Sequence, residues 1–489
     1  MKKRSLFTGL LFAVFSMLHL QAQDLPDGFA SVAGRGLATT TGGAGGKTVV
    51  VGSLDTLQAY AGKTGPYIII VRGVIASEEF AEVDIESNKT IVGLGTDATL
   101  KNIELHIIDK ENIIIRNLTI RDSYVEGDWD GKTNDNDAIQ ADNTHHLWID
   151  HCHLSRCGDG LMDIRKTGWD YITVSWVHLS RHNKAFGIGW TDDTVSKMTI
   201  HHCFFDSTRV RNPSCGNGKI HLYNNFTDRN EGGYGNLARG MARLVIENSF
   251  FRDATDPINS IEDGVIYAAG NDFENCLRNT TGNVDTMPFN PASYYDYELD
   301  SVHKVEEIVK AGANPQSTIS DQYTSGLQTV DLTVQVNEGN GSVTPGSGSF
   351  FKGETIQVMA TPDSGYLFDH WSGDASGTSP SLTITLDENT SVNAHFIEDT
   401  TPITSIAEVI NDANALSYYI NNKTKTLHVK SESQKLALSI YTTDGKLMIS
   451  KEYIQPGKLA IPLNRFTPGV YFVRFEFNNI VKTDQIILF

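Results

Sequence analysis

LWIDHCHL at residues 147–154, followed by ITVSWVHL at residues 172–179, is the stretch that decides the fold. Both runs are rich in β-branched and aromatic residues, which favour strands. Similar runs recur at IIIRNLTI (113–120), MTIHHCFF (198–205), IHLYNNFT (220–227) and LVIENSFF (244–251). From residue 147 onward the starts are 25, 26, 22 and 24 residues apart, a near-constant period that is typical of solenoids. Because no helical stripe accompanies the runs, the sequence predicts an all-β fold, a parallel β-helix with one coil per period.

Aligning the runs places five polar residues in one column, which predicts hydrogen bonds along the axis: Asn117, His151, His202, Asn224 and Asn248. Cys152 and Cys203 share the next column, two coils apart. Stacked strands lie about 4.8 Å apart, so these cysteines would be about 10 Å apart, too far for a disulfide. The chain has five cysteines and no CxxC pair, which argues against a zinc site and leaves the disulfide pattern open.

The bulk composition sets outer limits on the function. A chain of 489 residues predicts about three domains. A formal net charge of -19 argues against a general nucleic-acid binder and against a basic membrane-surface protein. It does not exclude an anionic substrate, because a local patch can oppose the overall sign.

The N-terminus has the pattern of a secretory signal peptide over residues 1–22. Basic residues at positions 2–4 precede an apolar run from Leu6 to Leu20, and Ala22 is a small residue before the expected cut. The alternative, a membrane anchor, is disfavoured because the run is short for a span. We therefore expect a secreted protein, extracellular or on the outer cell surface.

Three further boundaries follow from changes in pattern. Residues 23–316 contain the coils, and residues 317–329 form a predicted linker. Residues 330–397 show alternating strands between Gly, Ser and Pro turns, which predicts a small β-module. Residues 398–415 form a second predicted linker, rich in Thr and acidic residues, and residues 416–489 predict a small β-sandwich.

Two acidic clusters are the first candidates for chemistry. Asp135 and Asp137 lie in NDNDAIQAD, and Asp159 and Asp163 lie in GDGLMDI about one coil later. Carboxylates that converge without a basic partner are costly unless a cation binds them. Calcium suits such a set, because it takes oxygen ligands in flexible geometry. The alternative interpretation is a set of solvated loop acids.

A basic stretch lies farther along the chain. Residues 181–221 hold six basic residues against three acids, and among them Lys184 in RHNKAFGIG and Arg211 in TRVRNPS fall on consecutive coils. Beside calcium, these two would suit a polymer that carries carboxylates. The alternative is ordinary surface charge, which is favoured for Arg209 and Lys219.

Two other features have competing interpretations. Asp150 and His151 in WIDH are residue types suited to acid–base chemistry, but their place in the strand–turn stack favours a structural role. Trp190 suits either stacking on a sugar or packing.

The runs LWIDHCHLSRCGDGLMDIRKTGWDYITVSW, HNKAFGIG, HHCFFDSTRVRNP and IHLYNN, in this order, resemble the signature of the pectate lyase family, polysaccharide lyase family 1. GFASVAGRGLATTTGGAGG, SNKTIVGLG and PASYYDYELDSVHKVEEIVKAGA are similar too, so the resemblance extends from about residue 25 to residue 316. It implies a right-handed parallel β-helix. It also implies a calcium-dependent enzyme that cleaves α-1,4-linked polygalacturonate by β-elimination to 4,5-unsaturated oligogalacturonides.

The same resemblance implies roles for single residues. Arg211 matches the catalytic base and Lys184 a substrate-binding lysine. The implied Ca²⁺ ligands are Asp137, Asp159 and Asp163, with Asp135 as a further one. One position departs from the pattern: the family usually has a second arginine five residues after the catalytic one, where this chain has Gly216. That carboxylate clamp is missing or supplied elsewhere, and Arg209 and Lys219 are the candidates for substrate binding.

The implied mechanism has a physical basis. Removal of the C5 proton of galacturonate builds charge beside a carboxylate, and bound calcium would stabilise that charge. Neighbouring positive charge favours the neutral form of an arginine that must act as a base. Two alternatives stay open: a β-helix polygalacturonase, which is a hydrolase with paired carboxylates, and a non-catalytic pectin-binding surface protein.

The two C-terminal segments carry resemblances of their own. GSVTPGSGSFFKGETIQVMATPDSGYLFDHWSGD resembles the internalin-type B-repeat module, which implies a spacer or a binding accessory. TPGVYFVRFEFNNIVKTDQIILF is similar to the sorting domain of type IX secretion, which implies the type IX machinery as a partner. We expect a monomer that binds polygalacturonate or pectin and no nucleic acid.

Overall fold

The computed structural model of the chain describes residues 25–192, 195–230, 232–280, 282, 284–399, 416–421, 424–431, 435–455, 457–477 and 480–488. The predicted signal peptide and nearly all of the linker predicted at residues 398–415 lie outside these ranges. In the described part, no helix combines the length and apolar character needed to cross a bilayer. The chain divides into two compact units; the first contains the solenoid and also Ser349–Gln357 and Thr383–Glu388.

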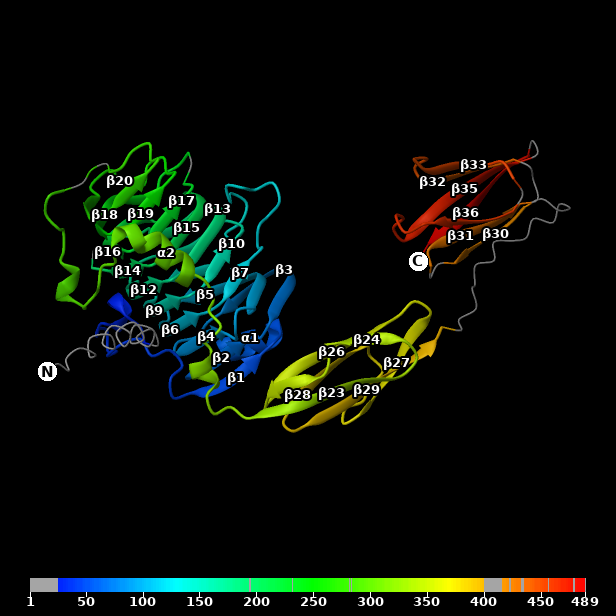
Figure 1. The fold of residues 1–489 in the computed structure, drawn as a ribbon, viewed down its shortest axis with the longest axis horizontal. Coiled ribbons are helices and arrows are strands. Elements are labelled where there is room, and N and C mark those ends of the chain that lie inside the picture. The colour runs from blue at the N-terminus through cyan, green and yellow to red at the C-terminus, as the bar shows by residue number, and fades with distance from the viewer. Residues whose placement is uncertain are drawn as a thin grey trace, which may run out of the picture. The chain divides into compact units, whose positions relative to one another are not determined.

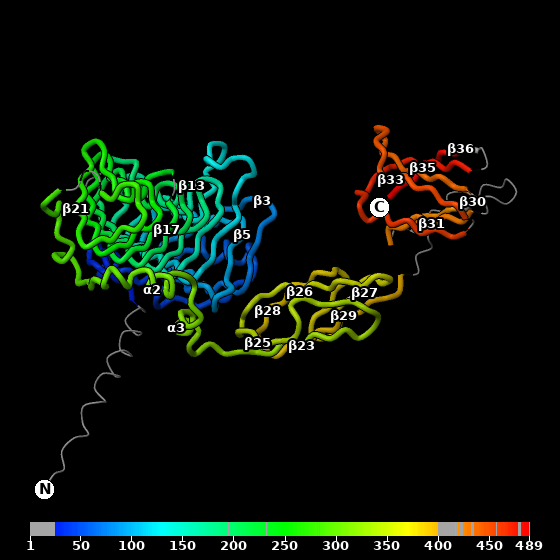
Figure 2. Tube along the Cα trace, turned by 45° about the horizontal axis from the view of Figure 1, so that its top comes forward, coloured from blue at the N-terminus to red at the C-terminus, as the bar shows by residue number. Residues whose placement is uncertain are grey.

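The solenoid is built from parallel strands that stack coil on coil in chain order, from blue at one end to green at the other (Figures 1 and 2). Its strands form three faces. The first face comprises β1 (Lys47–Val51), β2 (Tyr67–Val71), β4 (Lys89–Gly93), β6 (Glu111–Arg116), β9 (His145–Asp150), β12 (Asp170–Ser175), β14 (Lys197–His201), β16 (Ser214–Tyr223), β18 (Asn236–Glu247) and β21 (Val265–Ala269).

The second face comprises β3 (Val74–Asp84), β5 (Thr99–Ile108), β7 (Thr119–Arg121), β10 (His153–Ser155), β13 (His178–Gly189), β15 (Phe204–Val210), β17 (Phe226–Asp228), β19 (Phe250–Arg252) and β22 (Asp272–Glu274). The third face comprises β8 (Ile139–Asp142), β11 (Gly160–Arg165) and β20 (Ile258–Ser260), together with the ends of β5, β13, β16 and β18. The predicted parallel β-helix is confirmed.

Aliphatic side chains fill the interior of the solenoid in continuous columns. On the first face one column contains Ile69, Ile91, Ile115, Ile149, Val174, Ile200, Leu222 and Ile246, each in register with the next. All of them are essentially inaccessible to solvent. Each coil therefore buries its inner face against its neighbours, as the repeat of the sequence predicts.

The predicted polar column lies where the first-face strands end. Asn117, His151, His202, Asn224 and Asn248 all have positive φ, which asparagine tolerates better than most residues. One axial contact joins His202 Nε2 and Asn224 Nδ2 at 3.3 Å. Trp176 interrupts the column and stacks on the ring of His202 at 4.1 Å between centroids. The five cysteines are free thiols.

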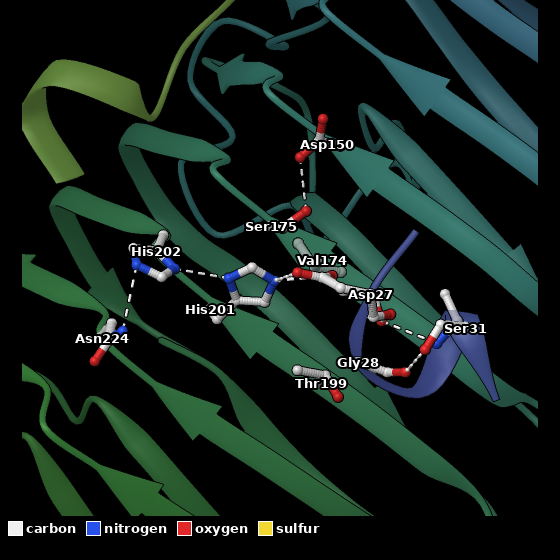
Figure 3. A network of polar contacts seen from close by, with 12 residues as sticks. Asp27, Gly28, Ser31, Asp150, Val174, Ser175, Thr199, His201, His202 and Asn224 are labelled. Atoms are coloured by element: carbon white, nitrogen blue, oxygen red, sulfur yellow. Dashed lines mark hydrogen bonds and ion pairs between the residues drawn. The ribbon is translucent and has the colours of Figure 1, made fainter. Parts of the chain in front are cut away.

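Helices and an N-terminal segment cover the outside of the solenoid. The helix α1 (Leu54–Ala61) buries Leu57 in the core, and α2 (Val302–Gly312) packs on a ladder of stacked phenylalanines that includes Phe204 and Phe226. The short helices α3 (Asp321–Thr324), η2 (Gly28–Ser31) and η3 (Pro291–Ser293) complete the set in the described residues. Figure 3 shows residues 27–31 crossing the first face, where the N–H of Phe29 donates to Thr199 Oγ1 at 3.1 Å.

Small sheets follow the solenoid in the chain. One sheet has the order β25 (Gly348–Phe351), β23 (Thr329–Glu338), β29 (Thr390–Glu398) and β27 (Tyr366–Gly373). The strands β24 (Gly341–Thr344) and β26 (Glu354–Pro362) are antiparallel partners, and β28 (Ser381–Leu386) follows them in the chain. The predicted small β-module is thus a set of short strands.

The C-terminal residues form two sheets around one core. They are β30 (Leu416–Asn421), β31 (Thr426–Ser431) and β34 (Gly457–Pro462) in one, and β33 (Leu447–Tyr453), β32 (Leu436–Thr442), β35 (Gly469–Phe477) and β36 (Ile480–Leu488) in the other. Side chains from both sheets share a single hydrophobic cluster that includes Leu427, Leu438 and Phe475. This arrangement is a small β-sandwich, as predicted.

Candidate active site

The third face presents polar side chains in two columns. On β11, Met162 and Ile164 point into the core, so strand alternation turns Asp163 and Arg165 outward. Asp163 is in register with Gly187 on β13, and Arg165 is in register with Gly189. Above these columns lies an open cavity of about 370 Å³, which is lined by Asp159, Asp163, Arg165, Lys166, Trp190 and Arg211.

Carboxylates from two consecutive coils converge beside this cavity. Asp135 and Asp137 lie between β7 and β8, and Asp159 immediately precedes β11. One carboxylate oxygen of each lies within 4.8 Å of the others. Asp163 adjoins them, because a Cβ added at Gly160 would lie 2.9 Å from Asp137 Oδ1 and 3.3 Å from Asp163 Oδ1. The structure thus brings the four predicted acids together.

Asp137 is the least compensated member of the group. Its Oδ1 accepts the N–H of Gly160 at 2.6 Å, whereas its buried Oδ2 has no hydrogen-bond partner in the described part of the chain. Burial, then the charges of Asp163 and Glu104, raise the pKa of Asp137 well above its usual range. Burial also raises the pKa of Asp163. Such a carboxylate is stable in the ionised form only when a cation neutralises it.

The other three acids have basic neighbours, which corrects the expectation that the cluster lacks them. Lys184 on β13 pairs with Asp159. Arg165 Nη1 lies 3.3 Å from Asp135 Oδ2, and Arg211 Nη1 lies 3.6 Å from Asp163 Oδ1. The positive groups therefore surround the cluster instead of standing apart from it.

Arg211 lies between β15 and β16 at the edge of the cavity. Its backbone carbonyl accepts the N–H of Phe186 at 2.8 Å, which fixes the residue against β13. Its guanidinium carbon lies 5.1 Å from the ring centroid of Trp190. The contact with Asp163 is too long for a hydrogen bond. The guanidinium is thus oriented by an aromatic face and is available to a ligand.

Trp190 lies over a residue that has no side chain. An added Cβ at Gly187 would be 2.2 Å from Trp190 Cη2 and 2.5 Å from Asp163 Oδ1. Glycine at this position therefore lets the indole approach the acidic cluster. Trp190 is 42% exposed. Its ring therefore contacts the guanidinium of Arg211 and also faces solvent.

Two predicted substrate-binding residues do not line this cavity. Arg209 is exposed on β15. The ammonium of Lys219 lies 3.4 Å from the hydroxyl oxygen of Tyr294. Their role in substrate binding stays a prediction.

Sequence reasoning missed two charged residues of the site. Glu104 accepts the backbone N–H of Asp137 at 2.8 Å, and burial raises its pKa to about 8. Arg165 bridges Asp135 and Asp142. The signal for Arg165 was its place two residues after Asp163, because residues i and i+2 of a strand share a face. No local pattern points to Glu104, which comes from another strand.

Known proteins share this fold and site region. Residues 5–314 match the family model described as pectate lyase, which covers more than half of the chain. The chain belongs to the pectate lyase family. Residues 332–400 match the divergent InlB B-repeat domain, and residues 418–488 match a secretion system C-terminal sorting domain. The predicted resemblances of all three segments are confirmed, and the family makes the chain a polysaccharide lyase. The sorting domain indicates secretion.

Curated relatives of this pectate lyase family member include two pectate trisaccharide-lyases. The one from Thermotoga sp. strain RQ2 is 34% identical over 337 residues, which cover 62% of this chain and 92% of the relative. The one from Bacillus licheniformis is 35% identical over 306 residues, which cover 58% and 85%. A pectin lyase from Bacillus subtilis is 29% identical over 349 residues, which cover 63% and 97%.

Solved structures agree on the fold of this pectate lyase family member. A pectate lyase from Paenibacillus sp. 0602 aligns with a TM-score of 0.51 at 17% identity, covering 62% of this chain and 98% of the other. A pectate lyase bound to a hexasaccharide aligns with a TM-score of 0.51 at 21% identity, covering 60% and 97%. At these identities the likeness concerns the β-helix alone.

Proposed function

We propose that this pectate lyase family member is a secreted, calcium-dependent enzyme that cleaves α-1,4-linked polygalacturonate by β-elimination and releases 4,5-unsaturated oligogalacturonides. The observation that carries the proposal is Asp137, a fully buried carboxylate without a cationic partner in the described residues, at the edge of a cavity lined by Arg211. The names of the Thermotoga and Bacillus licheniformis relatives support pectate as the polymer.

The acidic residues fit a calcium ion by their chemistry. They offer only carboxylate oxygens, which Ca²⁺ prefers, and Gly160 leaves space between two of them. The orphaned Oδ2 of Asp137 provides a ligand atom with no competing hydrogen bond. We assign the site to Asp135, Asp137, Asp159 and Asp163. When bound there, calcium would act as a Lewis acid on a galacturonate carboxylate and stabilise the charge that develops beside it.

Arg211 is the proposed base. In its neutral form it takes the proton from C5 of a galacturonate unit, and the electron pair of that C–H bond forms the C4–C5 double bond. The C4–O bond breaks, its electron pair leaves with the oxygen, and a proton from solvent completes the new chain end.

The cationic groups also bind and orient the polymer. Lys184 already pairs with a carboxylate, Asp159, so a galacturonate carboxylate would find an ammonium in place. Arg165 and Lys166 line the cavity and share Asp142 as a partner. Their shared attachment to a buried acid fixes them as a positive wall for an anionic chain.

The remaining expectations about the chain belong to the same proposal. Residues 1–22 direct export, and the C-terminal sandwich directs passage by the type IX secretion machinery to the exterior or the outer cell surface. The family match to a sorting domain supports this destination. The enzyme acts as a monomer, and the module at residues 330–397 serves as a spacer or as a binding accessory.

Ultraviolet absorbance of the unsaturated uronide tests the proposal on the full chain. With polygalacturonate and calcium we expect the absorbance to grow, and Arg211→Ala should reduce its rate by at least about a hundredfold, the usual scale for loss of a general base. Near-ultraviolet circular dichroism checks that the variant is folded. Reducing ends that appear without the absorbance would mean hydrolysis, and binding without cleavage would mean a pectin-binding protein; either result would refute the proposal.

A further inference from the structure

We propose that Arg239 binds a substrate carboxylate next to Arg211 and supplies, from the next coil, the guanidinium that is missing at Gly216. The inference rests on the proposed function and adds a specificity-determining residue to the same site. It differs from the sequence-based expectation, which assigned this task to Arg209 or Lys219.

The strand register places Arg239 beside Gly216. Cys215 on β16 pairs with Ala238 on β18, and a register shift follows between Cys215 and Asn217. Both Cys215 and Ala238 point into the core, so the residues that follow them, Gly216 and Arg239, face outward. A Cβ added at Gly216 would lie 4.0 Å from Arg239 Nε. The side chain of Arg239 therefore reaches over the position where this chain lacks one.

Glycines make room for this side chain on two coils. Gly189 precedes Gly216 in the same outward column, and a Cβ added at Gly189 would lie 3.3 Å from the Cα of Gly216. Arg165 precedes both glycines in this column, in register with Gly189. Two guanidinium-bearing residues thus border a strip without side chains, and the strip adjoins the cavity that holds Asp163 and Arg211.

Trp190 links Arg239 directly to Arg211. The guanidinium carbon of Arg239 lies 5.6 Å from the centroid of the Trp190 ring, and that of Arg211 lies 5.1 Å from the same ring. Stacking on an indole orients a guanidinium and leaves its N–H edge free to donate. One aromatic side chain therefore holds two arginines at one site.

Arg239 differs in its surroundings from several other arginines of the solenoid. In the ranges that the structure describes, no carboxylate forms an ion pair with Arg239. By contrast, Arg252 pairs with Asp228 and Glu306, and Arg165 pairs with Asp135 and Asp142. A half-buried, oriented guanidinium without a carboxylate beside an open cavity is matched to an incoming one. A polymer with one carboxylate per sugar would offer a carboxylate to Arg239 while Arg211 acts at C5 of a galacturonate unit.

The test compares Arg239→Ala and Arg239→Lys with Arg243→Ala in the full chain. Arg243 lies on the same strand, but its Nη1 donates to the carbonyls of Ala242 and Asp263 outside the cavity, so its removal controls for charge and for strand β18. The first readout is the calorimetric affinity for an oligogalacturonate with calcium, in an Arg211→Ala background. The second is kcat and KM of the otherwise unchanged enzyme on polygalacturonate and on highly methyl-esterified pectin.

We expect Arg239→Ala to weaken oligogalacturonate binding by about tenfold or more, the usual scale for a charge-assisted hydrogen bond. KM on polygalacturonate should rise more than kcat falls, Arg239→Lys should recover part of the loss, and the penalty should shrink on the methyl ester, which offers no carboxylate. Arg243→Ala should leave both readouts unchanged. Equal affinities for Arg239→Ala and Arg243→Ala, or an equal penalty on both polymers, would overturn the inference.

The two proposals fail in different ways. If the wild-type chain forms no unsaturated product, the proposed function fails, while the calorimetric comparison still decides whether Arg239 binds a uronate carboxylate.

Discussion

Asp137 and Asp150 are both fully buried carboxylates of the solenoid, yet their surroundings are opposite. Asp150 lies at the end of β9 on the first face. Its carboxylate oxygens contact Arg116 Nε at 2.8 Å, His151 Nδ1 at 2.7 Å and Ser175 Oγ at 2.7 Å. Figure 3 shows the contact with Ser175. Burial acts to raise the pKa of Asp150, but His151 and Arg116 together hold it below its usual range. The negative charge of Asp150 is thus fully paired within the fold.

Asp137, beside the third face, has the same residue type and burial without that pairing. Burial raises its pKa, and the neighbouring charges of Asp163 and Glu104 raise it further. The comparison teaches that burial alone does not separate a structural acid from a functional one; the separating feature is whether the fold supplies the counter-charge. The chain supplies the counter-charge of Asp150, whereas the described residues supply none for Asp137, and this difference is the ground for the proposed calcium site.

The largest expected change in stability follows substitution of Asp150, the carboxylate that is paired within the fold. Asp150→Asn should lower the free energy of unfolding by about 3–5 kcal/mol, because it leaves the buried guanidinium of Arg116 without its counter-charge. Chemical denaturation of the full chain, followed by the signal of the solenoid, measures this. A loss below about 1 kcal/mol would show that the pairing of Asp150 contributes little to stability. Asp150 would then no longer serve as the example of a carboxylate that stabilises the fold.

The matched change on the unpaired side should have the opposite sign. Asp137→Asn should raise the free energy of unfolding in chelator, since burial and the charges of Asp163 and Glu104 make the ionised carboxylate costly in the apo fold. The same variant should lose the stabilisation that calcium gives the wild type. Destabilisation in chelator would contradict the view of Asp137 as an uncompensated charge.

The pH dependence of the stability of the calcium-free protein should show the cost of burying an acidic group at this site. The ordinary pKa of a glutamate is near 4.5, and that of Glu104 is raised to about 8 in the fold. Between these values the folded chain holds a proton that the unfolded chain has lost, so the free energy of unfolding falls as pH rises. Buried histidines with lowered pKa values, such as His153 and His202, act in the opposite direction below pH 6.5. The contribution of Glu104 is therefore isolated by comparing the wild type with Glu104→Gln in chelator: the midpoint of thermal unfolding of the wild type, relative to that of the variant, should fall from pH 5 to pH 8. A relative midpoint that rises over this window would contradict the raised pKa of Glu104.

The smallest expected effect concerns Asp135, the most exposed acid of the cluster. Its side chain is 59% exposed and already pairs with Arg165. Asp135→Asn should weaken calcium binding only severalfold, since water and Arg165 screen its charge, whereas Asp137→Asn should abolish it. Calcium titration calorimetry of both variants measures the contrast, and equal losses would remove burial as the explanation.

The fold was predictable from the sequence because the first-face strands repeat on a regular period. Runs such as Leu147–Leu154 span a first-face strand and the second-face strand after it. Each recurrence of such a run in the sequence therefore marks one coil. The third face escaped notice, since β8 and β11 have four and six residues and lie in loops of variable length. The acids were found by composition in those loops, without knowledge of the strands that carry them.

The parts of the site that could not be predicted depend on register. Arg165 and Lys184 contact the acids only because particular strands align, which falsified the premise of a cluster without basic partners. Arg239 lies 23 residues after Gly216 in the sequence, and a register shift decides that the two meet. Such shifts follow from packing across coils, which no local pattern encodes.

The measurement that tests the central claim most directly is the rate of unsaturated-uronide formation from polygalacturonate during a calcium titration of the wild type and Asp137→Asn. The wild type should be silent in chelator and should regain its rate as calcium is added, whereas folded Asp137→Asn should stay inactive at calcium concentrations that saturate the wild type. An undiminished rate in chelator, or a wild-type calcium response in Asp137→Asn, would contradict the assignment of this buried carboxylate as the centre of a calcium-dependent lyase.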